Sequence, residues 1–397
     1  MHLKIRERSL GLVASHGSMM TLAISLNLMP VFLPILRRSA QGAAVLTNEQ
    51  LGRISATAFA GVVSGLLVSG PLANRFQAKW FTVGGNLLIA CGLVALGLSG
   101  SYRNILAGVA LMGIGGGILD MILSPIVCAL RPDHKAQAMN WLHSFYCIGA
   151  VLTVLAATIA FERSFSWQEV ALWMSVPPFI LGVTFLFLRH PLLVSEETKL
   201  ARVRDLLPQR FFLLASGAIF LAGAAEMGVA QWLPAYAELE LGMSRAVGGA
   251  SLLSFSVAMA LGRIGIGALS GRVSMFRLMA WGSGSTAFLL LLAGLFPDAR
   301  VSLGACIASG FAVSCLWPGI LASAADQFPS AGASMFGALS AFGNFGGILM
   351  PWAIGAIADR GDIALGIAAS AVCPLLVLAA VKAMRASNGV RAGRPAA

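Results

Sequence analysis

The sequence is short of charged residues. Only 11% of its 397 residues are Asp, Glu, Lys or Arg, and acidic residues number 16 against 27 basic ones. A soluble domain carries about 25% charged residues, because water must solvate its surface. This shortage excludes an ordinary soluble enzyme or binding domain and indicates a chain that lies largely in a nonpolar environment.

Patterns for metal, redox or nucleotide chemistry are also lacking. The six cysteines all fall inside apolar runs, and none has CxxC or Cys/His ligand spacing, so we expect small buried side chains. The glycine run 113–117 follows no strand, so it predicts helix packing and not a dinucleotide loop. Without a catalytic triad pattern either, the sequence predicts no enzyme, no metal site and no organic cofactor. The cysteines are Cys91, Cys128, Cys147, Cys306, Cys315 and Cys373.

Long apolar runs make up most of the chain, which is 58% hydrophobic. A helix needs about 20 apolar residues to cross a bilayer, whereas a β-barrel would show alternating segments of about 10. The sequence therefore predicts an all-α polytopic membrane protein with 12 transmembrane helices. The expected spans are 11–36, 51–73, 79–99, 104–130, 137–161, 167–188, 211–234, 246–270, 275–296, 301–325, 331–358 and 362–383.

The basic residues predict the orientation. With the N-terminus in the cytoplasm, the inner segments hold 18 Lys and Arg and the outer loops hold seven. Positive charge favours the cytoplasmic side, so both termini are expected inside, in a cell inner (plasma) membrane protein. The net charge of +11 then implies contact with anionic lipid and not with nucleic acid.

The two halves of the chain resemble each other at an offset of 197 residues. GPLANR at 70–75 matches GALSGR at 267–272, and 147–163 aligns with 344–360. The basic segment 189–210 separates six spans from six. We therefore expect an N-terminal six-helix bundle over 1–188, a cytoplasmic linker over 189–210, and a C-terminal six-helix bundle over 211–397.

This plan resembles the major facilitator superfamily. The segments GPLANRFQAK and GALSGRVSMFR are similar to the family's loop G-x-L-A-D-R-x-G-x-K/R, with Asn74 in place of its Asp and Gln77 in place of its Gly. The resemblance implies that Arg75 and Arg272 belong to gating loops.

Asp120 lies inside the fourth apolar span, where a charged side chain costs about 2.5–3.5 kcal/mol. Helical periodicity places Gly113, Gly116 and Asp120 on one face, and places Asn140 and His143 on one face of the next span. At 1.5 Å per residue, the depths of Asp120 and His143 agree to within about 5 Å. We expect the two side chains to pair beside a water-accessible cavity, where Asp120 could carry a proton; an interhelical hydrogen-bonding tie is the alternative.

The second half contributes Glu226, which we expect in the outer half of its span and, with Asp120 and His143, assign to proton coupling. Trp232 lies six residues later and could stack on a solute or pack internally. Trp317 stands 197 residues after Asp120 and is expected to face the same cavity. Arg263 is expected to contact helix ends on the cytoplasmic side.

The fourth and fifth spans permit a narrower comparison. The segment GILDMILSP at 117–125 and the pattern Asn140-x-x-His143-x-Phe145 resemble motifs of the fucose–galactose–glucose:proton symporters, with Ser124 where that family has Asn. The resemblance implies uptake of a monosaccharide. The expected substrate-binding residues are Asn27, Asn140, His143, Trp232, Trp317 and Asn344.

The function predicted from these features is proton-coupled symport of a small polar solute by alternating access, with sodium as the alternative coupling ion. A drug or organic-anion transporter of the same fold, with Arg263 or Arg53 as the counter-charge, stays open, as does a non-transporting membrane receptor. The expected partners are a small-molecule substrate and the lipid bilayer, and the protein is expected to be a monomer.

Overall fold

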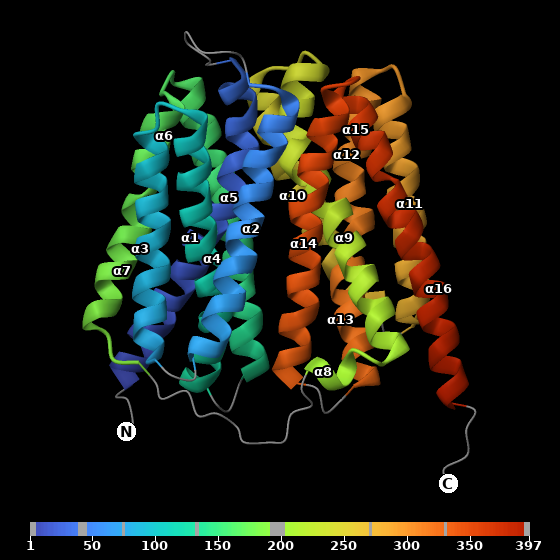
Figure 1. The fold of residues 1–397 in the computed structure, drawn as a ribbon, viewed down its shortest axis with the longest axis horizontal. Coiled ribbons are helices and arrows are strands. Elements are labelled where there is room, and N and C mark those ends of the chain that lie inside the picture. The colour runs from blue at the N-terminus through green and yellow to red at the C-terminus, as the bar shows by residue number, and fades with distance from the viewer. Residues whose placement is uncertain are drawn as a thin grey trace. The chain divides into compact units, whose positions relative to one another are not determined.

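The computed structural model describes residues 5–38, 46–73, 76–131, 135–190, 203–269, 272–328 and 332–392. These residues form helices and no β-strand, as the apolar runs predict. Twelve helical segments among them are long and apolar enough to cross a membrane, so the predicted fold class is confirmed (Figure 1).

The chain divides into two compact units. Unit 1 comprises Met1–Gln41 and Ile54–Glu196, and unit 2 comprises Gly42–Arg53 and Glu197–Ala397. The start of the second helix therefore groups with the second unit, although the rest of that helix groups with the first.

Unit 1 is built on close contacts of the glycine-rich fourth helix with its neighbours. A side chain at Gly115 would overlap backbone of α3, and one at Gly117 would overlap backbone of α2. The glycine run is therefore a packing surface that brings helix backbones together. The helices that lie wholly or mostly in this unit are α1 (Ile5–Arg38), α2 (Asn48–Ala73), α3 (Ala78–Gly97), α4 (Tyr102–Leu130), α5 (Lys135–Glu162), α6 (Trp167–Met174) and α7 (Val176–Phe187).

A buried polar network ties α1 to α3. The amide of Asn86 accepts from the Thr21 hydroxyl at 3.0 Å and donates to Ser18 Oγ at 2.8 Å. All three side chains are buried, and Asn86 also donates to its own helix at Thr82 O. Because the amide oxygen and nitrogen both have partners, the network adds directional contacts inside an apolar bundle.

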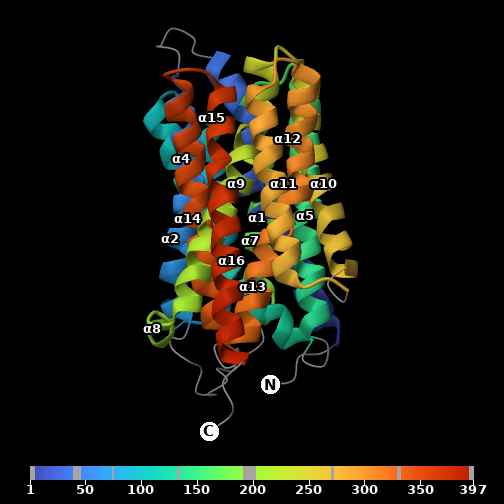
Figure 2. The ribbon, with the colours of Figure 1, turned by 90° about the vertical axis from the view of Figure 1, so that its right-hand side faces the viewer.

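Unit 2 also consists of long helices in succession, with shorter helical segments among them. In the side view α16 runs along the front of this unit, and α11 packs against it (Figure 2). The elements are α8 (Val203–Leu206), α9 (Arg210–Ala235), the π-helix η2 (Tyr236–Glu240), α10 (Arg245–Leu269), α11 (Met275–Leu295), α12 (Ala299–Val313), α13 (Leu316–Gln327), α14 (Gly332–Ala358), α15 (Ile363–Ser370) and α16 (Val372–Ala392).

Two spans break at equivalent places. The sixth is interrupted at Ser175 between α6 and α7, and the last at Ala371 between α15 and α16. Pro177 and Pro374 follow these breaks and are 197 residues apart. Proline lacks an N–H and clashes with the carbonyl four residues before it, so each break has a local cause. The shared offset adds a structural match to the sequence repeat.

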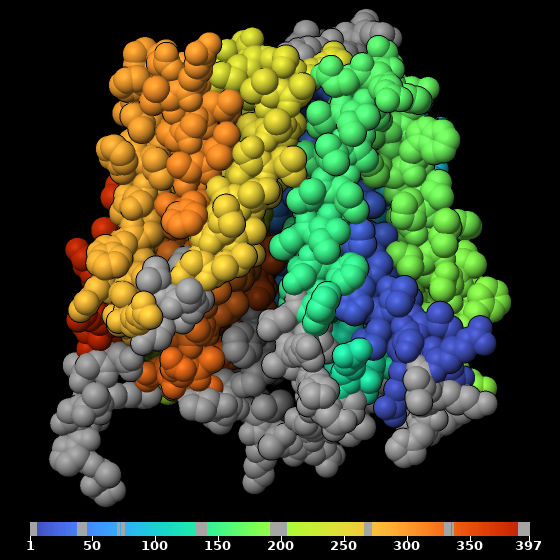
Figure 3. Space-filling view, turned by 180° about the vertical axis from the view of Figure 1, so that it is seen from behind, coloured from blue at the N-terminus to red at the C-terminus, as the bar shows by residue number. Residues whose placement is uncertain are grey.

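Large apolar side chains cover the outside of α6 and α7. Trp173, Phe179, Ile180 and Phe187 are more than half exposed, and Phe187 is 83% exposed. Figure 3 shows the face of unit 1 that α5, α6 and α7 form. An apolar patch of this extent indicates contact with lipid.

Polar contacts anchor the chain at the end of α7 beside the starts of α1 and α3. Lys79 Nζ donates to Leu186 O at 2.6 Å, and Arg189 pairs with Glu7 at 3.4 Å. His190 Nε2 lies 2.9 Å from Thr82 Oγ1. Burial lowers the pKa of His190 below its usual value, and nearby Lys79 lowers it further, although the backbone contact at Leu188 acts the other way.

Acidification is expected to loosen this anchor. Because its pKa is lowered, His190 binds fewer protons in the anchored state than when this segment is released. The free energy that holds the anchor is therefore present in full above about pH 6.5, the ordinary pKa of histidine, and is lost as pH falls. Backbone amide exchange in a peptide covering 186–190 should therefore speed up from pH 7.5 to 5.5, after correction for intrinsic rates. His190→Gln should remove this pH dependence; an unchanged dependence would contradict the assignment to His190.

Candidate functional site

In unit 1, the structure brings Asp120 and His143 near each other. Asp120 is half-buried on α4, His143 is exposed on α5, and the two interact electrostatically. One turn before Asp120, a side chain at Gly116 would overlap Ser25 of α1, so α1 lies close to this face of α4. The arrangement can hold a proton on either group, since a carboxylate and an imidazole are both titratable.

Asn27 lies on α1 and contacts α5. Its amide donates to Tyr146 Oη at 3.2 Å and to Ala23 O at 2.9 Å. Tyr146 did not emerge from the sequence analysis, although it stands three residues after His143 and therefore near the same helix face. On the same pair of helices, the ring of His16 packs against Phe145 with ring centroids 4.6 Å apart.

In unit 2, Glu226 of α9 pairs with Arg263 of α10. The Nη2 and Oε1 atoms are 3.5 Å apart, and the side chain of Glu226 is only 4% exposed, against 41% for Arg263. Arg263 Nη2 also lies 3.7 Å from Met259 Sδ. The expectation that Arg263 contacts helix ends is therefore wrong: its long side chain reaches Glu226 instead.

The position of Glu226 also differs from the expectation. Its span runs from Arg210 to Glu240 and has 31 residues, so Glu226 lies at the middle and not in the outer half. The predicted span ended at 234, where the sequence has a proline, a residue that commonly ends a helix. The π-helix Tyr236–Glu240 continues the span beyond that proline.

Trp232 is a packing residue in this structure. Its side chain is completely buried, and the indole N–H donates to Pro351 O at 2.8 Å. Neither a ring face nor the N–H is therefore free for a solute, which contradicts the expected role in substrate binding. The alternative of internal packing holds.

Trp317 and Asn344 are both half-buried in unit 2. The Trp317 ring lies directly over Gly343 of α14, where a larger residue would overlap it. Asn344, the next residue along α14, donates to Ser340 O of its own helix at 3.0 Å, which leaves its amide oxygen as an acceptor. Helices α13 and α14 thus meet where the Trp317 ring packs on Gly343, next to the amide of Asn344.

The structure does not describe two of the predicted site residues. Arg75 lies outside the described residues, and the side chain of Asn140 lies outside the described part of α5. Arg272 is described and exposed. Among the described residues, no group of three or more His, Cys, Asp or Glu side chains is arranged to hold a metal ion.

Comparison with known proteins identifies related transporters. A family model described as Major Facilitator Superfamily matches residues 13–351. The cis,cis-muconate transport protein of Acinetobacter baylyi is 23% identical over 378 residues, which cover 90% of this chain and 87% of that protein.

Two solved structures have the same fold. A mutant of the nucleoside transporter NupG superposes with a TM-score of 0.77 at 12% identity, over 95% of this chain and 99% of that one. A mutant of the E. coli fucose:proton symporter FucP gives 0.63 at 18% identity, over 94% and 98%. At these identities the likeness concerns the fold and not the substrate.

Proposed function

This chain belongs to the Major Facilitator Superfamily, and on that premise we propose that it is a proton-coupled transporter of a small organic carboxylate. That it is a multi-pass membrane transporter and not an enzyme follows from the family. The choice of a carboxylate as the substrate is supported by the ion pair Glu226–Arg263, in which a buried acid faces a half-exposed guanidinium.

The unequal burial of this pair suggests how a proton and a carboxylate could be coupled. An ionised carboxylate that is buried without a partner is strongly unfavourable, so Glu226 can release Arg263 only if it takes up a proton. The freed guanidinium can then bind the carboxylate of a solute through two parallel hydrogen bonds. One proton therefore accompanies each carboxylate that replaces Glu226.

Unit 1 supplies a second titratable site, which we assign to Asp120 and His143. In the same unit, Asn27 and Tyr146 form an amide–hydroxyl pair, which we assign to hydrogen bonding with a solute. Alternating access, the general mechanism of transporters built from two repeats, would carry the solute across, with both termini in the cytoplasm. We propose a monomer in the inner (plasma) membrane.

The relative from Acinetobacter baylyi supports this choice of solute, because muconate is a dicarboxylate. A monosaccharide is the second candidate, favoured by the amide–hydroxyl pair of Asn27 and Tyr146, which suits sugar hydroxyls. The ion pair of Arg263 favours the carboxylate over the sugar, since a neutral sugar has no charged group that would displace Glu226 from Arg263.

Uptake into proteoliposomes tests the substrate class. With an inward proton gradient, we expect accumulation of cis,cis-muconate, which collapses when an ionophore dissipates the gradient. The dimethyl ester of muconate has a similar length but no charge, and should neither accumulate nor compete. Accumulation of L-fucose without accumulation of muconate would overturn the carboxylate proposal in favour of the sugar.

A further inference from the structure

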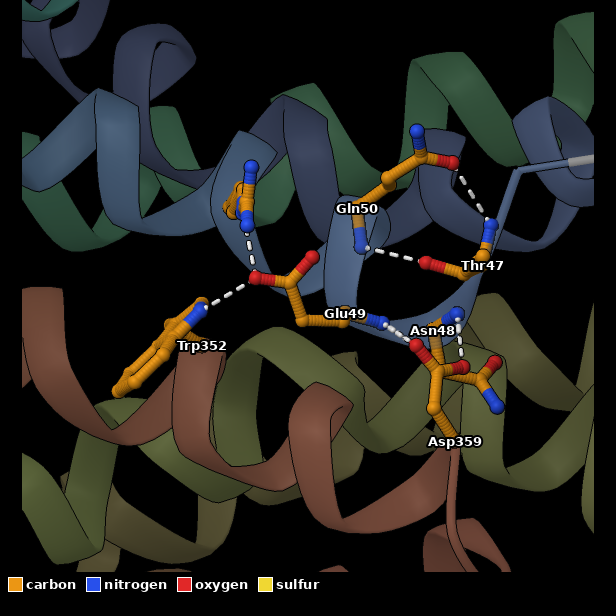
Figure 4. Close-up of polar contacts among 7 residues, drawn as sticks. Thr47, Asn48, Glu49, Gln50, Trp352 and Asp359 are labelled. Carbon is orange, nitrogen blue, oxygen red and sulfur yellow. Dashed lines mark hydrogen bonds and ion pairs between the residues drawn. The ribbon is translucent and has the colours of Figure 1, made fainter.

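The indole of Trp317 differs from those of the two tryptophans on the neighbouring helices α9 and α14. Trp232 donates its N–H to Pro351 O, and Trp352 donates to Oε1 of Glu49, a residue that groups with unit 2 (Figure 4). Trp317 is half-buried and has no hydrogen bond from its side chain to any residue that the structure describes. A buried indole usually finds a partner for its N–H, so Trp317 does not serve as a tie between helices.

The ring of Trp317 lies close to the turn of α9 that carries Glu226. Its atoms Cη2 and Cζ3 would overlap a side chain at Gly343 of α14, and a side chain at Gly223 of α9 would overlap Gly343 O. Gly223 precedes Glu226 by three residues, which makes them neighbours on one helix face, about 5–6 Å apart. The ring and this turn of α9 therefore meet at the same glycine.

Arg263 stands beside the break that precedes Trp317. A side chain at Gly262 of α10 would overlap Ser314, which lies between α12 and α13, three residues before Trp317. Arg263 follows Gly262 directly and pairs with Glu226 at 3.5 Å. The guanidinium, the carboxylate and the ring thus belong to elements that meet within about one helical turn, all of them in unit 2.

We propose that Trp317 determines specificity by selecting carboxylates with a flat conjugated or aromatic skeleton, an inference that rests on the proposed function. Arg263 holds the carboxylate of the solute, and the indole of Trp317 stacks on the π-system beside it. Stacked π-systems gain free energy beyond the area that they bury, whereas a saturated chain has no π face. The site therefore binds an unsaturated acid more tightly than a saturated acid of the same length and charge.

Calorimetric titration of the purified full-length protein with cis,cis-muconate and with adipate tests this inference. Both have six carbons and two carboxylates, but only muconate is conjugated. We expect muconate to bind about tenfold more tightly. Trp317→Leu should weaken muconate binding about tenfold and change adipate binding less than twofold, whereas Trp317→Phe should keep most of the preference. The effect of the substitution is decisive, because muconate is also the stiffer of the two acids.

Two further variants separate the ring from general effects of substitution. Trp281→Leu is the matched control, because Trp281 lies on α11 of the same unit and is 60% exposed, and it should keep the tenfold preference. Gly343→Ala keeps Trp317 but displaces its ring, and should reduce the preference at least threefold. Its control is Gly337→Ala on the same helix, because no atom lies within 4 Å of a side chain there.

The possible results distinguish this inference from the proposed function. Equal binding of muconate and adipate, or a preference that survives both Trp317→Leu and Gly343→Ala, would overturn the selection by Trp317 and leave the carboxylate proposal standing. Binding of neither acid would overturn the proposed function, and this inference with it. Thermal unfolding of each variant shows whether it is folded, and Gly343→Ala carries the test if Trp317→Leu is not.

Discussion

Arg263→Met is expected to destabilise the protein by about 3 kcal/mol and to abolish carboxylate accumulation. The substitution leaves Glu226, which is 4% exposed, without its counter-charge, and breaking a buried ion pair from one side costs about 3–5 kcal/mol. Thermal unfolding in detergent should show the loss. It should deepen from pH 6 to pH 8, because the unpaired acid must stay protonated in the folded variant and releases that proton on unfolding.

The reverse substitution is expected to be mild. Glu226→Gln leaves Arg263 41% exposed, so water still solvates the guanidinium. The double variant Glu226→Gln/Arg263→Met should unfold within about 1 kcal/mol of the unmodified protein, since replacing both partners of a buried pair is nearly neutral, yet it should not transport muconate. Equal destabilisation by the two single substitutions would contradict the unequal burial on which the mechanism depends.

Asp120→Asn is expected to reduce proton-driven accumulation by about 100-fold while solute exchange at equal concentrations continues. Asparagine keeps the size of the side chain but cannot carry a proton, and exchange needs only the loaded carrier. Counterflow and gradient-driven uptake in the same proteoliposomes measure the two separately. Asp298→Asn is the control, because Asp298 caps the start of its own helix at Arg300 N and Val301 N.

If the Asp120→Asn variant accumulates solute normally, Asp120 is an interhelical tie and not a proton carrier. If exchange is lost together with accumulation, the residue positions the solute or the helices. Either result would remove Asp120 from proton coupling and leave that role to Glu226 and His143.

The number and approximate positions of the membrane spans could be predicted from the sequence, because long apolar runs with few charges are stable in few structures other than membrane-spanning helices. It also brought Asp120 and His143 together, since helix rise and antiparallel order fix the depth of residues on consecutive spans. Both inferences rest on regular helix geometry, which the described residues of α4 and α5 follow.

Irregular geometry explains most of the differences. The π-helix after Pro234 lengthens the seventh span and moves Glu226 to its middle, which residue counting along a regular helix does not reveal. Nothing in the sequence around Trp232 indicates that its N–H donates to Pro351 O, which lies 119 residues later in the chain. Arg263 could have been paired with Glu226 by the rule that a charge inside a span needs a partner.

The central claim is that a solute carboxylate replaces Glu226 on Arg263 and that Glu226 takes up a proton when this happens. Calorimetric titration of the purified protein with cis,cis-muconate, in two buffers of different ionisation enthalpy at pH 7, counts the protons taken up on binding. We expect one proton more for the unmodified protein than for Glu226→Gln. Equal proton uptake by the two proteins, with muconate bound by both, would contradict the claim.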